Sequence, residues 1–275
     1  MKPRDTYENI ATRARHLLDL HDGLVNTRQR RIRSDWGEAF CRVMHWKKSS
    51  NIERVDSKDA IIVLRDGAKL APDDFTRDSL ADLLRAALAL GVGALDRYVH
   101  ERVVKRIIGA LSGKKLTQQQ QDLAIPVVPA LEAARRAVRA SVKRTSKAYE
   151  AHEGTPGSAA KVQCRPANEM RMELQKYLHT RAFQSWREIQ HAFSLLGITD
   201  LKAQIIDREG IADFRKEIVE PLNRAVRRRN VFVHEGDLVR HKRAGKVRPE
   251  PISRTFVKDS LDFLNRLVDV LERVS

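Results

Sequence analysis

One apolar stripe constrains the fold of this chain more than any other feature of its sequence. Thr76, Asp78 and Ser79 can each cap the start of a helix. After them, apolar residues recur at intervals of three or four: Leu80, Leu84, Leu88, Val92, Leu95, Val99, Val103 and Ile107. This spacing predicts a long helix over about 76–108 whose apolar face other helices must cover. Gly91 and Gly93 lower its helix propensity, so we expect a close helix–helix approach there.

Helical patterns also precede and follow this segment. Residues 5 to about 32 carry apolar residues at helical spacing. Further helices are expected from Ala167 to about Leu196 with a stop at Gly197, over 199–208, and from near Asp213. A last helix carries the stripe Val257, Leu261, Leu264, Val268 and Leu271. The stretch 61–70 is β-branched and contains Asp66-Gly67, which predicts an extended arm or a small hairpin.

Composition agrees with a helical chain. Aromatic residues make up only 5% of the 275 residues, and glycine and proline are few, so the pattern favours helix over sheet. We therefore predict an all-α helical bundle formed by a single domain, 1–275. Its parts are core helices at about 76–108 and 167–275, an N-terminal helical region at 1–75, and a basic helical insertion at about 109–165.

The chain is strongly basic. Its 52 lysines and arginines against 36 acidic residues give a formal net charge of +16, which favours binding to RNA, DNA or an anionic membrane face. No stretch approaches the roughly 18 apolar residues of a membrane span, and the N-terminus has no apolar signal core. A helix over 131–149 places Arg139 and Lys143 on a basic face. A nucleic-acid contact and a solvated surface are both open readings of that face.

The cysteines indicate a reducing compartment. Cys41 and Cys164 are the two cysteines of the chain, and neither lies in a pair at metal-binding spacing. We expect both to be reduced thiols in a cytoplasmic protein. Neither a metal nor a cofactor is expected.

The stretch NRAVRRRNVFVHEGD, residues 223–237, has the residue types that phosphodiester chemistry requires. RNA carries its own nucleophile, the 2′-hydroxyl. Histidine transfers protons near neutral pH, and arginine presents a permanently charged fork to phosphate. On an ideal helix Arg229 and His234 lie roughly 140° apart, so they converge only where the helix bends or ends, or where a partner chain supplies a second copy. The alternative is an arginine-rich surface turn with a capping histidine.

RRRNVFVH resembles the R-x4-6-H motif of HEPN domains. Arg229 leaves four intervening residues before His234, Arg228 five and Arg227 six; Asn230 directly after Arg229 favours the first register. The stretch with VHEGD and PIS, and ALDRYVH in the long helix, are similar to the RiboL-PSP-HEPN family. That resemblance implies a helical bundle that usually forms a homodimer, with two motifs facing a shared cleft. Many such proteins are metal-independent endoribonucleases, and some only bind RNA.

The resemblance also implies roles for individual residues. His234 acts as general base or acid, Arg229 holds and neutralises the scissile phosphate, and Asn230 orients the motif or contacts the phosphate. Residues expected to bind RNA are Arg227, Arg228, Lys242, Arg243, Lys246, Arg139 and Lys143. Asp96 and His100 match the family signature, and packing or a buried hydrogen bond is favoured over chemistry for both. Glu235 is a further auxiliary residue.

The expected function is therefore that of a HEPN-type endoribonuclease, a toxin or an antiviral-defence effector. It would leave 2′,3′-cyclic phosphate and 5′-hydroxyl ends. The strong positive charge favours a structured substrate such as tRNA or rRNA, read through its backbone. An antitoxin or a phage-sensing subunit is an expected partner. A non-catalytic RNA-binding or scaffold module of a defence complex remains the alternative, and a DNA-binding regulator is a third.

Overall fold

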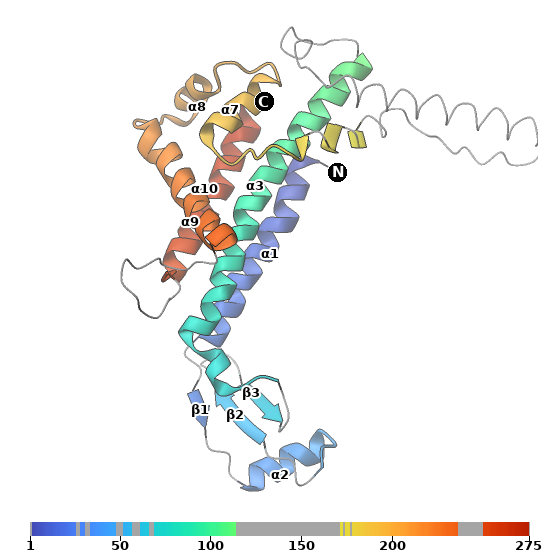
Figure 1. Ribbon diagram of the computed structural model, residues 1–275, viewed down its shortest axis with the longest axis vertical. Helices are drawn as coiled ribbons and strands as arrows, with labels where there is room; N and C mark the ends of the chain where they lie inside the picture. The colour runs from blue at the N-terminus through green and yellow to red at the C-terminus, as the bar shows by residue number, and fades with distance from the viewer. Residues whose placement is uncertain are drawn as a thin grey trace, which may run out of the picture. The chain divides into compact units, whose positions relative to one another are not determined.

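The computed structural model is mostly helical (Figure 1). It describes residues 2–25, 28–30, 34–47, 52–56, 61–65, 69–113, 171–172, 174–176, 178–235 and 250–274. Helices account for 78% of the described residues, in agreement with the prediction of a helical fold. A small antiparallel sheet is also present, so the described part is not purely α-helical. The predicted basic helix at 131–149 lies outside the described residues.

The chain divides into two compact units, each made of several segments. The first comprises Met1–Tyr7, Leu95–Asn223 and Leu267–Ser275, and the second comprises Glu8–Ala94 and Arg224–Arg266. Four helices contribute residues to both: α1 (Pro3–Leu24), α3 (Arg77–Gly113), α9 (Glu220–Glu235) and α10 (Arg254–Arg273). The single HEPN-type domain stays a prediction. None of the described helices is both long enough and apolar enough to cross a membrane.

Helix α3 is the long helix that the apolar stripe predicts. All eight residues of the stripe are at most 6% exposed. Thr76 caps the helix, because its Oγ1 accepts a hydrogen bond from the Ser79 backbone N–H at 3.3 Å. The predicted start is therefore confirmed, and the helix continues to Gly113, a few residues past the predicted end.

The expected close approach is confirmed at Gly91 and wrong at Gly93. A Cβ on Gly91 would collide with the Leu261 side chain and lie 3.4 Å from a methyl of Leu264, so α3 and α10 meet there with no room for a side chain. A Cβ on Gly93 would meet nothing within 4 Å. Gly93 is exposed, and the structure gives no packing reason for it.

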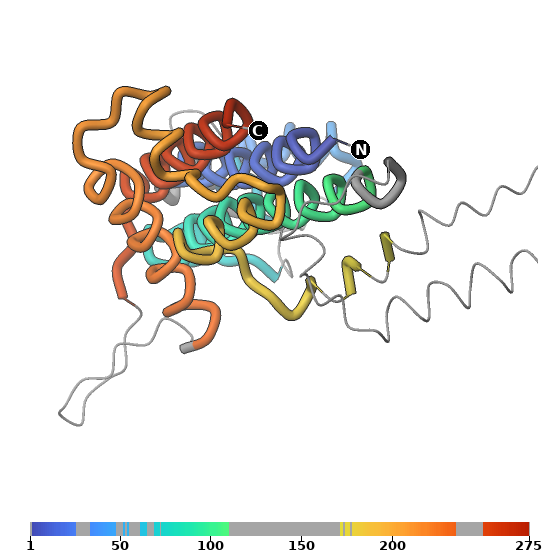
Figure 2. The backbone as a smooth tube through the Cα atoms, turned by 90° about the horizontal axis from the view of Figure 1, so that it is seen from above, coloured from blue at the N-terminus to red at the C-terminus, as the bar shows by residue number. Residues whose placement is uncertain are grey.

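In the second unit, α1 and α3 lie side by side and run in opposite directions in both views (Figures 1 and 2). The predicted first helix is too long, because α1 ends at Leu24 and β1 (Arg28–Arg30) follows. Between Val25 and Ile32 no apolar residue continues the helical stripe. Instead the backbone of β1 pairs with β2 in an antiparallel ladder, with Arg28 opposite Asp56.

The small sheet has the order β1-β2-β3, with β2 at Ile52–Asp56 and β3 at Ile61–Arg65. The expected extended segment at 61–70 is therefore present in part. Its partner among the described residues is β2, which lies upstream. Residues 66–68, with the Asp66-Gly67 pair, lie outside the described residues. Leu64 and Phe75, the latter in η1 (Pro72–Phe75), are buried against Leu24 and Ile62. This small core joins the sheet to the end of α1.

Helix α2 (Ser34–Val43) carries an aromatic cluster next to the sheet. The rings of Trp36 and Phe40 stack at 5.2 Å, and the Arg54 guanidinium of β2 lies 5.3 Å from the Trp36 ring centroid. Cys41 is buried on the same helix as a free thiol. Cys164 lies outside the described residues.

In the first unit, the helix predicted from Ala167 to Leu196 is wrong as a single element. Helical turns occur within 171–178, and α7 (Trp186–Ser194) begins after a non-helical stretch. One distant and one local hydrogen bond explain the break. The Phe183 N–H donates to Asp96 Oδ1 at 2.6 Å, and Ser185 caps α7 by accepting from the Glu188 N–H at 3.2 Å. The predicted stop at Gly197 is confirmed, with a φ of 89°.

The remaining predicted helices are confirmed. Helix α8 spans Leu201–Glu209 and ends at left-handed Gly210. The next helical segment starts at Phe214, directly after Asp213. Asp213 Oδ1 accepts from the Lys216 N–H at 3.1 Å, and Glu217 Oε1 accepts from the Asp213 N–H at 3.0 Å. This segment opens with a π-turn, η2 (Arg215–Val219), beside Pro221, which has no N–H for the regular helical ladder.

Glu101 is a buried carboxylate of the first unit, only 5% exposed. Arg171 Nη2 lies 2.5 Å from its Oε2, and its Oε1 contacts Arg97 at 2.7 Å and the Gln175 amide at 3.1 Å. Both carboxylate oxygens are thus paired, as a buried charge requires. Through this contact the turns at 171–178 are held on α3.

Candidate functional site

The predicted motif lies on α9, which is helical through Glu235. With 100° per residue, Arg229 and His234 lie roughly 140° apart around an unbroken helix. Arg227 precedes His234 by seven residues, which places the two roughly 20° apart and about two turns from each other. Asn230 belongs to the same flank. The α9 geometry therefore groups Arg227, Asn230 and His234, and leaves Arg229 on another side.

Exposure follows the same division. Arg227 and His234 are exposed, whereas Arg228, Arg229 and Asn230 are half-buried. Glu235 is the last residue of α9. Nothing beyond its backbone position is described. Of the predicted motif, Arg227 and His234 are thus the charged or titratable side chains with most access to a ligand.

A cleft of about 1320 Å³ opens in the second unit beside α9. Its walls are the first turns of α3, the α9 residues from Arg224 to Val231, and the segment 250–256 that leads into α10. Its cationic lining residues are Arg77, Arg85, Arg224, Arg227, Arg228 and Arg254, and its carboxylates are Asp78 and Glu250. Among the described residues that line the cleft, six guanidinium groups stand against two carboxylates, which makes this lining strongly positive. Arg229, Asn230 and His234 are not among its lining residues.

Two of these arginines fix one wall of the cleft. Arg85 Nη2 of α3 and Arg228 Nη2 of α9 donate to the Glu250 carbonyl oxygen at 3.1 and 2.8 Å. Arg228 Nη1 also lies 3.3 Å from the Glu250 carboxylate, and its guanidinium lies 6.0 Å from the Phe232 ring centroid. Arg228, predicted to bind RNA, is therefore engaged in holding the segment before α10.

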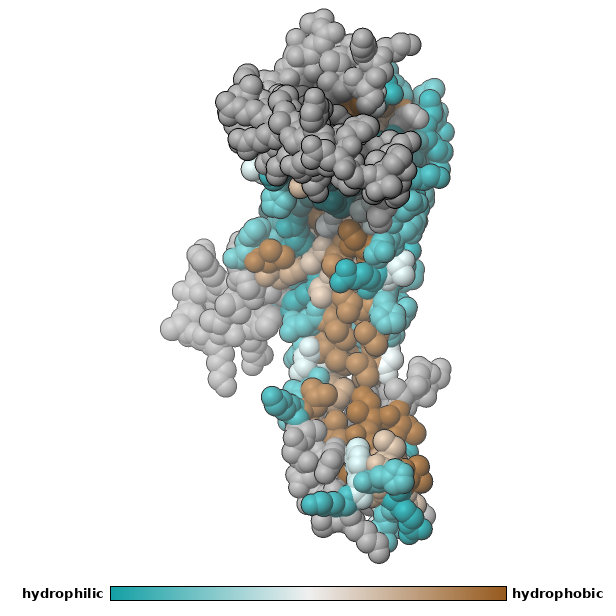
Figure 3. Space-filling view, turned by 90° about the vertical axis from the view of Figure 1, so that its right-hand side faces the viewer, coloured by the Kyte–Doolittle hydropathy of each residue, from teal (hydrophilic) through white to brown (hydrophobic). Residues whose placement is uncertain are grey.

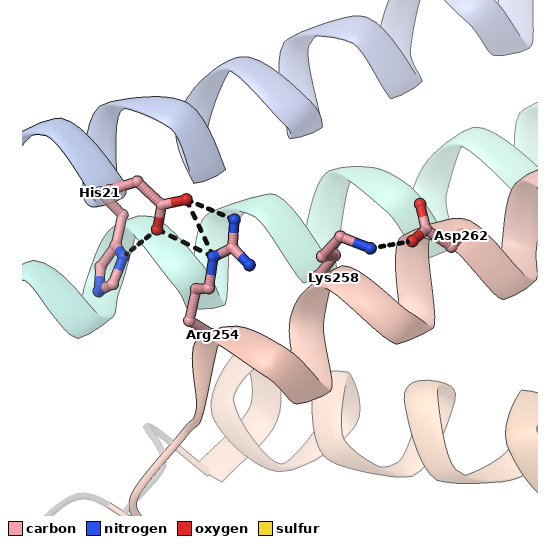
Figure 4. Close-up of polar contacts among 5 residues, drawn as sticks. His21, Arg254, Lys258 and Asp262 are labelled. Carbon is pink, nitrogen blue, oxygen red and sulfur yellow. Dashed lines mark hydrogen bonds and ion pairs between the residues drawn. The ribbon is translucent and has the colours of Figure 1, made fainter.

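A third arginine fixes the cleft where α1 meets the start of α10 (Figure 4). Arg254 Nε and Nη2 form a forked pair with the Asp22 carboxylate at 2.5 to 3.0 Å, and His21 Nδ1 lies 3.3 Å from Asp22 Oδ1. The Arg254 guanidinium holds the pKa of Asp22 below its ordinary value, against the effect of burial. His21 lines the cleft and is only 4% exposed. Farther along α10, Lys258 pairs with Asp262 at 2.8 Å.

The other three arginines of the cleft present their charge to solvent. Arg77, Arg224 and Arg227 are exposed. Within the part of the chain that the structure describes, none of them forms an ion pair or a side-chain hydrogen bond. Arg77 lies at the start of α3, and Arg224 and Arg227 lie one turn apart on α9. Positive charge is therefore available on two walls of the cleft.

Asp96 and His100 lie together in the first unit, on α3. Asp96 Oδ1 accepts from the Phe183 N–H at 2.6 Å, and His100 Nε2 lies 3.0 Å from the Arg181 carbonyl oxygen and 3.6 Å from Asp96 Oδ2. The His100 ring also packs on Phe183 at 4.7 Å. Both side chains thus hold the stretch between the turns at 171–178 and α7, which agrees with the structural role favoured for them. Burial lowers the pKa of His100, although the Asp96 carboxylate opposes that shift.

This burial makes the stability of the protein dependent on pH. Because the pKa of folded His100 lies below its ordinary value of 6.5, the unfolded chain binds the proton more readily. We expect the free energy of unfolding to be highest above that value and to fall as the pH is lowered from it toward the folded pKa. Urea denaturation of the wild type and of His100→Gln between neutral and mildly acidic pH tests this. The variant should show the weaker dependence, and His16→Gln, at an exposed histidine of α1, should match the wild type. If the free energy of unfolding of His100→Gln depended on pH as strongly as that of the wild type, His100 would not be its cause.

Several predicted RNA-binding residues cannot be placed. They lie outside the described residues: Lys242, Arg243 and Lys246 between α9 and α10, and Arg139 and Lys143 in the predicted basic helix. In the described ranges, no group of three or more His, Cys, Asp or Glu side chains is arranged to hold a metal ion.

The cleft also contains residues that the sequence reading did not single out. The spacing Arg224, Arg227, Val231, His234 follows one flank of a helix and could have indicated that Arg224 accompanies the motif. His21, Arg77, Arg85 and Arg254 gave no comparable signal. Their neighbours in the cleft lie far away in the sequence, such as Asp22 for Arg254 and Glu250 for Arg85.

The chain was compared with models of known protein families, with curated proteins and with solved structures, and none of the three comparisons finds a significant match.

Proposed function

We propose that the chain is a metal-independent endoribonuclease of the HEPN type. The observation that carries this proposal is the exposed flank of α9, where Arg227 and His234 lie roughly 20° apart with Asn230 beside them. The resemblance of RRRNVFVH and ALDRYVH to HEPN sequences supports it. Arginine and histidine together supply the charge and the proton transfer that RNA cleavage needs.

The proposed reaction uses the 2′-hydroxyl of RNA as nucleophile. The 2′-oxygen forms a bond to the phosphorus while the bond from phosphorus to the 5′-oxygen breaks. His234 either takes the proton from the 2′-hydroxyl or gives a proton to the leaving 5′-oxygen, and solvent water makes the other of these two transfers. An arginine neutralises the phosphoryl oxygens, where charge accumulates in the transition state. The products are a 2′,3′-cyclic phosphate and a 5′-hydroxyl.

Two registers are available for that arginine. Arg227 lies on the flank of His234 in the same chain, so it serves a site formed by one α9 helix. Arg229 is the arginine of the R-x4-6-H motif that the following Asn230 favours. Around the α9 axis, however, Arg229 lies roughly 140° from His234. Arg229 therefore serves His234 only if a second copy of the motif is placed opposite, as in the proposed homodimer.

A homodimer needs an apolar or complementary surface on each chain. Figure 3 shows apolar side chains gathered in a band between polar side chains on one face of the molecule. In the second unit Leu20, Ile61 and Leu70 are 42%, 61% and 56% exposed. Contiguous apolar surface, such as this band, is typical of interaction sites and supports the proposed self-association.

In the cell, we propose a role as a toxin or an antiviral-defence effector acting on tRNA or rRNA. The net charge of +16 supports binding to a structured RNA through its backbone. Unrestrained cleavage of such RNA would harm the host. An antitoxin or a phage-sensing subunit is therefore proposed as a partner that restrains or triggers the activity.

A non-catalytic RNA-binding or scaffold module is the second candidate. The observation that favours it is the separation of Arg229 from His234 around an unbroken helix. In a single chain, these two side chains then do not face the same phosphate. Such a module would bind RNA through the same arginines and leave it intact.

Incubation of the purified chain with total tRNA in the presence of EDTA tests the proposal. We expect cleavage that leaves 2′,3′-cyclic phosphate and 5′-hydroxyl ends, because neither the proton transfer nor the charge neutralisation requires a metal ion in this scheme. The ends are read by their resistance to direct phosphatase and ligase treatment. Cleavage that EDTA abolishes would overturn metal independence. Intact tRNA that is nevertheless bound in a salt-dependent manner would favour the binding module.

A further inference from the structure

We propose that the cleft between α3, α9 and the segment 250–256 binds the sugar-phosphate backbone of a single RNA strand and directs it toward His234. The direction of the strand toward His234 rests on the proposed function. Binding of RNA in the cleft does not depend on it. The proposal assigns a substrate-binding role to Arg77 and Arg224, which lie outside the R-x4-6-H motif.

The charge of the cleft is the first argument. Glu250 is already paired with Arg228. Arg254 is paired with Asp22, which does not line the cleft. Of the described lining residues, Asp78 is then the carboxylate that remains, against the exposed guanidinium groups of Arg77, Arg224 and Arg227. A concave surface with clustered positive charge concentrates anions.

The rigidity of the cleft is the second argument. Arg85 and Arg228 reach the Glu250 carbonyl oxygen from α3 and α9, and the forked pair of Arg254 with Asp22 holds the start of α10. These contacts fix the spacing of the walls before a ligand arrives. A fixed frame lowers the entropy cost of binding, which favours a built site over a chance cluster of surface charge.

Size and chemistry identify the ligand as a chain of phosphates. Pockets for small ligands occupy about 300–1,000 Å³, whereas this cleft has a volume of about 1320 Å³. In the part of the lining that the structure describes, the lysine and arginine positions are all arginine, and the guanidinium fork matches phosphate oxygens in a bidentate geometry. Charges on two walls suit a ligand with several phosphates. Phe256 and Ile252 add apolar surface on which a base can rest.

The direction of the bound strand follows from α9. Arg224 and Arg227 lie roughly 4.5 Å apart along the helix axis, and Val231 lies one turn farther along the same lining. His234 follows Val231 by three residues on that flank. A backbone held by Arg224 and Arg227 therefore leaves the cleft at the end of α9 that carries His234.

Binding of a fluorescent 2′-O-methyl RNA oligonucleotide, measured by anisotropy at several salt concentrations, tests the inference without cleavage. We expect Arg77→Ala and Arg224→Ala each to weaken binding about tenfold. The slope of log K against log salt should become shallower by about 0.7 for each arginine removed, as for single strands. Arg13→Ala is the matched control, because Arg13 is an exposed arginine of the same unit that does not line the cleft.

Wild-type affinity and salt slope in both Arg77→Ala and Arg224→Ala would overturn the inference. So would displacement of the RNA by poly-glutamate as readily as by unlabelled RNA at equal charge, because the cleft would then select acidic polypeptides equally well. A failure of the proposed function can be distinguished from a failure of the cleft. Loss of binding in the cleft variants of a protein that never cuts tRNA refutes the ribonuclease and supports the cleft. Cleavage with an unchanged KM in both variants refutes the cleft and supports the ribonuclease.

Discussion

His234→Ala protein should cut RNA about 10²–10⁴-fold more slowly than the wild type, with its affinity for RNA unchanged. The side chain is exposed at the last turn of α9, and its removal leaves no buried space behind. Folding should therefore be preserved, and the loss should appear in kcat. His16→Ala, at an exposed histidine of α1, is the matched control and should cleave at the wild-type rate. The measurement is the rate of tRNA cleavage in EDTA, with KM determined for each protein.

Arginine variants in the same assay decide whether Arg227 of the same chain or Arg229 of a partner chain neutralises the phosphate. Replacement by lysine retains the charge but removes the fork that binds phosphate oxygens in pairs. If the site is formed by one α9 helix, Arg227→Lys should lower kcat strongly and Arg229→Lys weakly. If a partner chain completes the site, the order should be reversed. In that case a mixture of Arg229→Lys and His234→Ala subunits should recover activity, because a mixed dimer contains one intact site.

Full activity in His234→Ala protein would refute the role of His234 and, with it, the proposed mechanism. Loss of activity in both His234→Ala and the His16→Ala control would point to damage to the fold instead. Circular dichroism of each variant separates the two cases. A cleavage activity that survives in His234→Ala but disappears in EDTA would belong to a different site or a contaminating nuclease.

The long helices could be predicted because their signal is local. The stripe from Leu80 to Ile107 and that from Val257 to Leu271 repeat over several turns, and Thr76 supplies a cap. The errors occurred where distant contacts decide the structure. The break before α7 depends on Asp96, far away on α3, and the end of α1 depends on β1 pairing with β2. Local periodicity contains no information on either contact, although the lack of apolar residues between Val25 and Ile32 indicates that the apolar stripe of α1 stops there.

The candidate site was predictable to the same extent. Arg227 and His234 share a flank of α9 because they are seven residues apart, and the sequence alone gives that spacing. Asn230, directly after Arg229, favours Arg229 as the arginine of the motif, and this assignment remains a prediction. The cleft was not predictable, because it depends on contacts such as Arg85 with Glu250 and Arg254 with Asp22. These bring α1, α3 and α10 together from opposite ends of the chain.

Gly91→Val should destabilise the protein by about 1–3 kcal/mol, the cost of forcing extra methyl groups into a packed core. A Cβ at Gly91 already collides with the buried side chain of Leu261, and valine adds two methyl groups near Leu264. The same replacement at Gly93 is the matched control, because a Cβ there meets nothing within 4 Å. Gly93→Val should be neutral or stabilising by a few tenths of a kcal/mol, since valine has the higher helix propensity. Urea denaturation measures both, and equal effects of the two variants would contradict the close approach.

A second substitution tests whether the cost at Gly91 arises from the contact with Leu261 itself. Leu261→Ala alone should cost about 2–5 kcal/mol, because it leaves a cavity where α3 meets α10. In the double variant the valine methyl groups occupy part of that cavity, so the total loss should be smaller than the sum of the two single losses. Strict additivity would mean that valine at position 91 is accommodated elsewhere, by a shift of the helices. In that event the absence of a side chain at Gly91 would not be what sets the distance between α3 and α10.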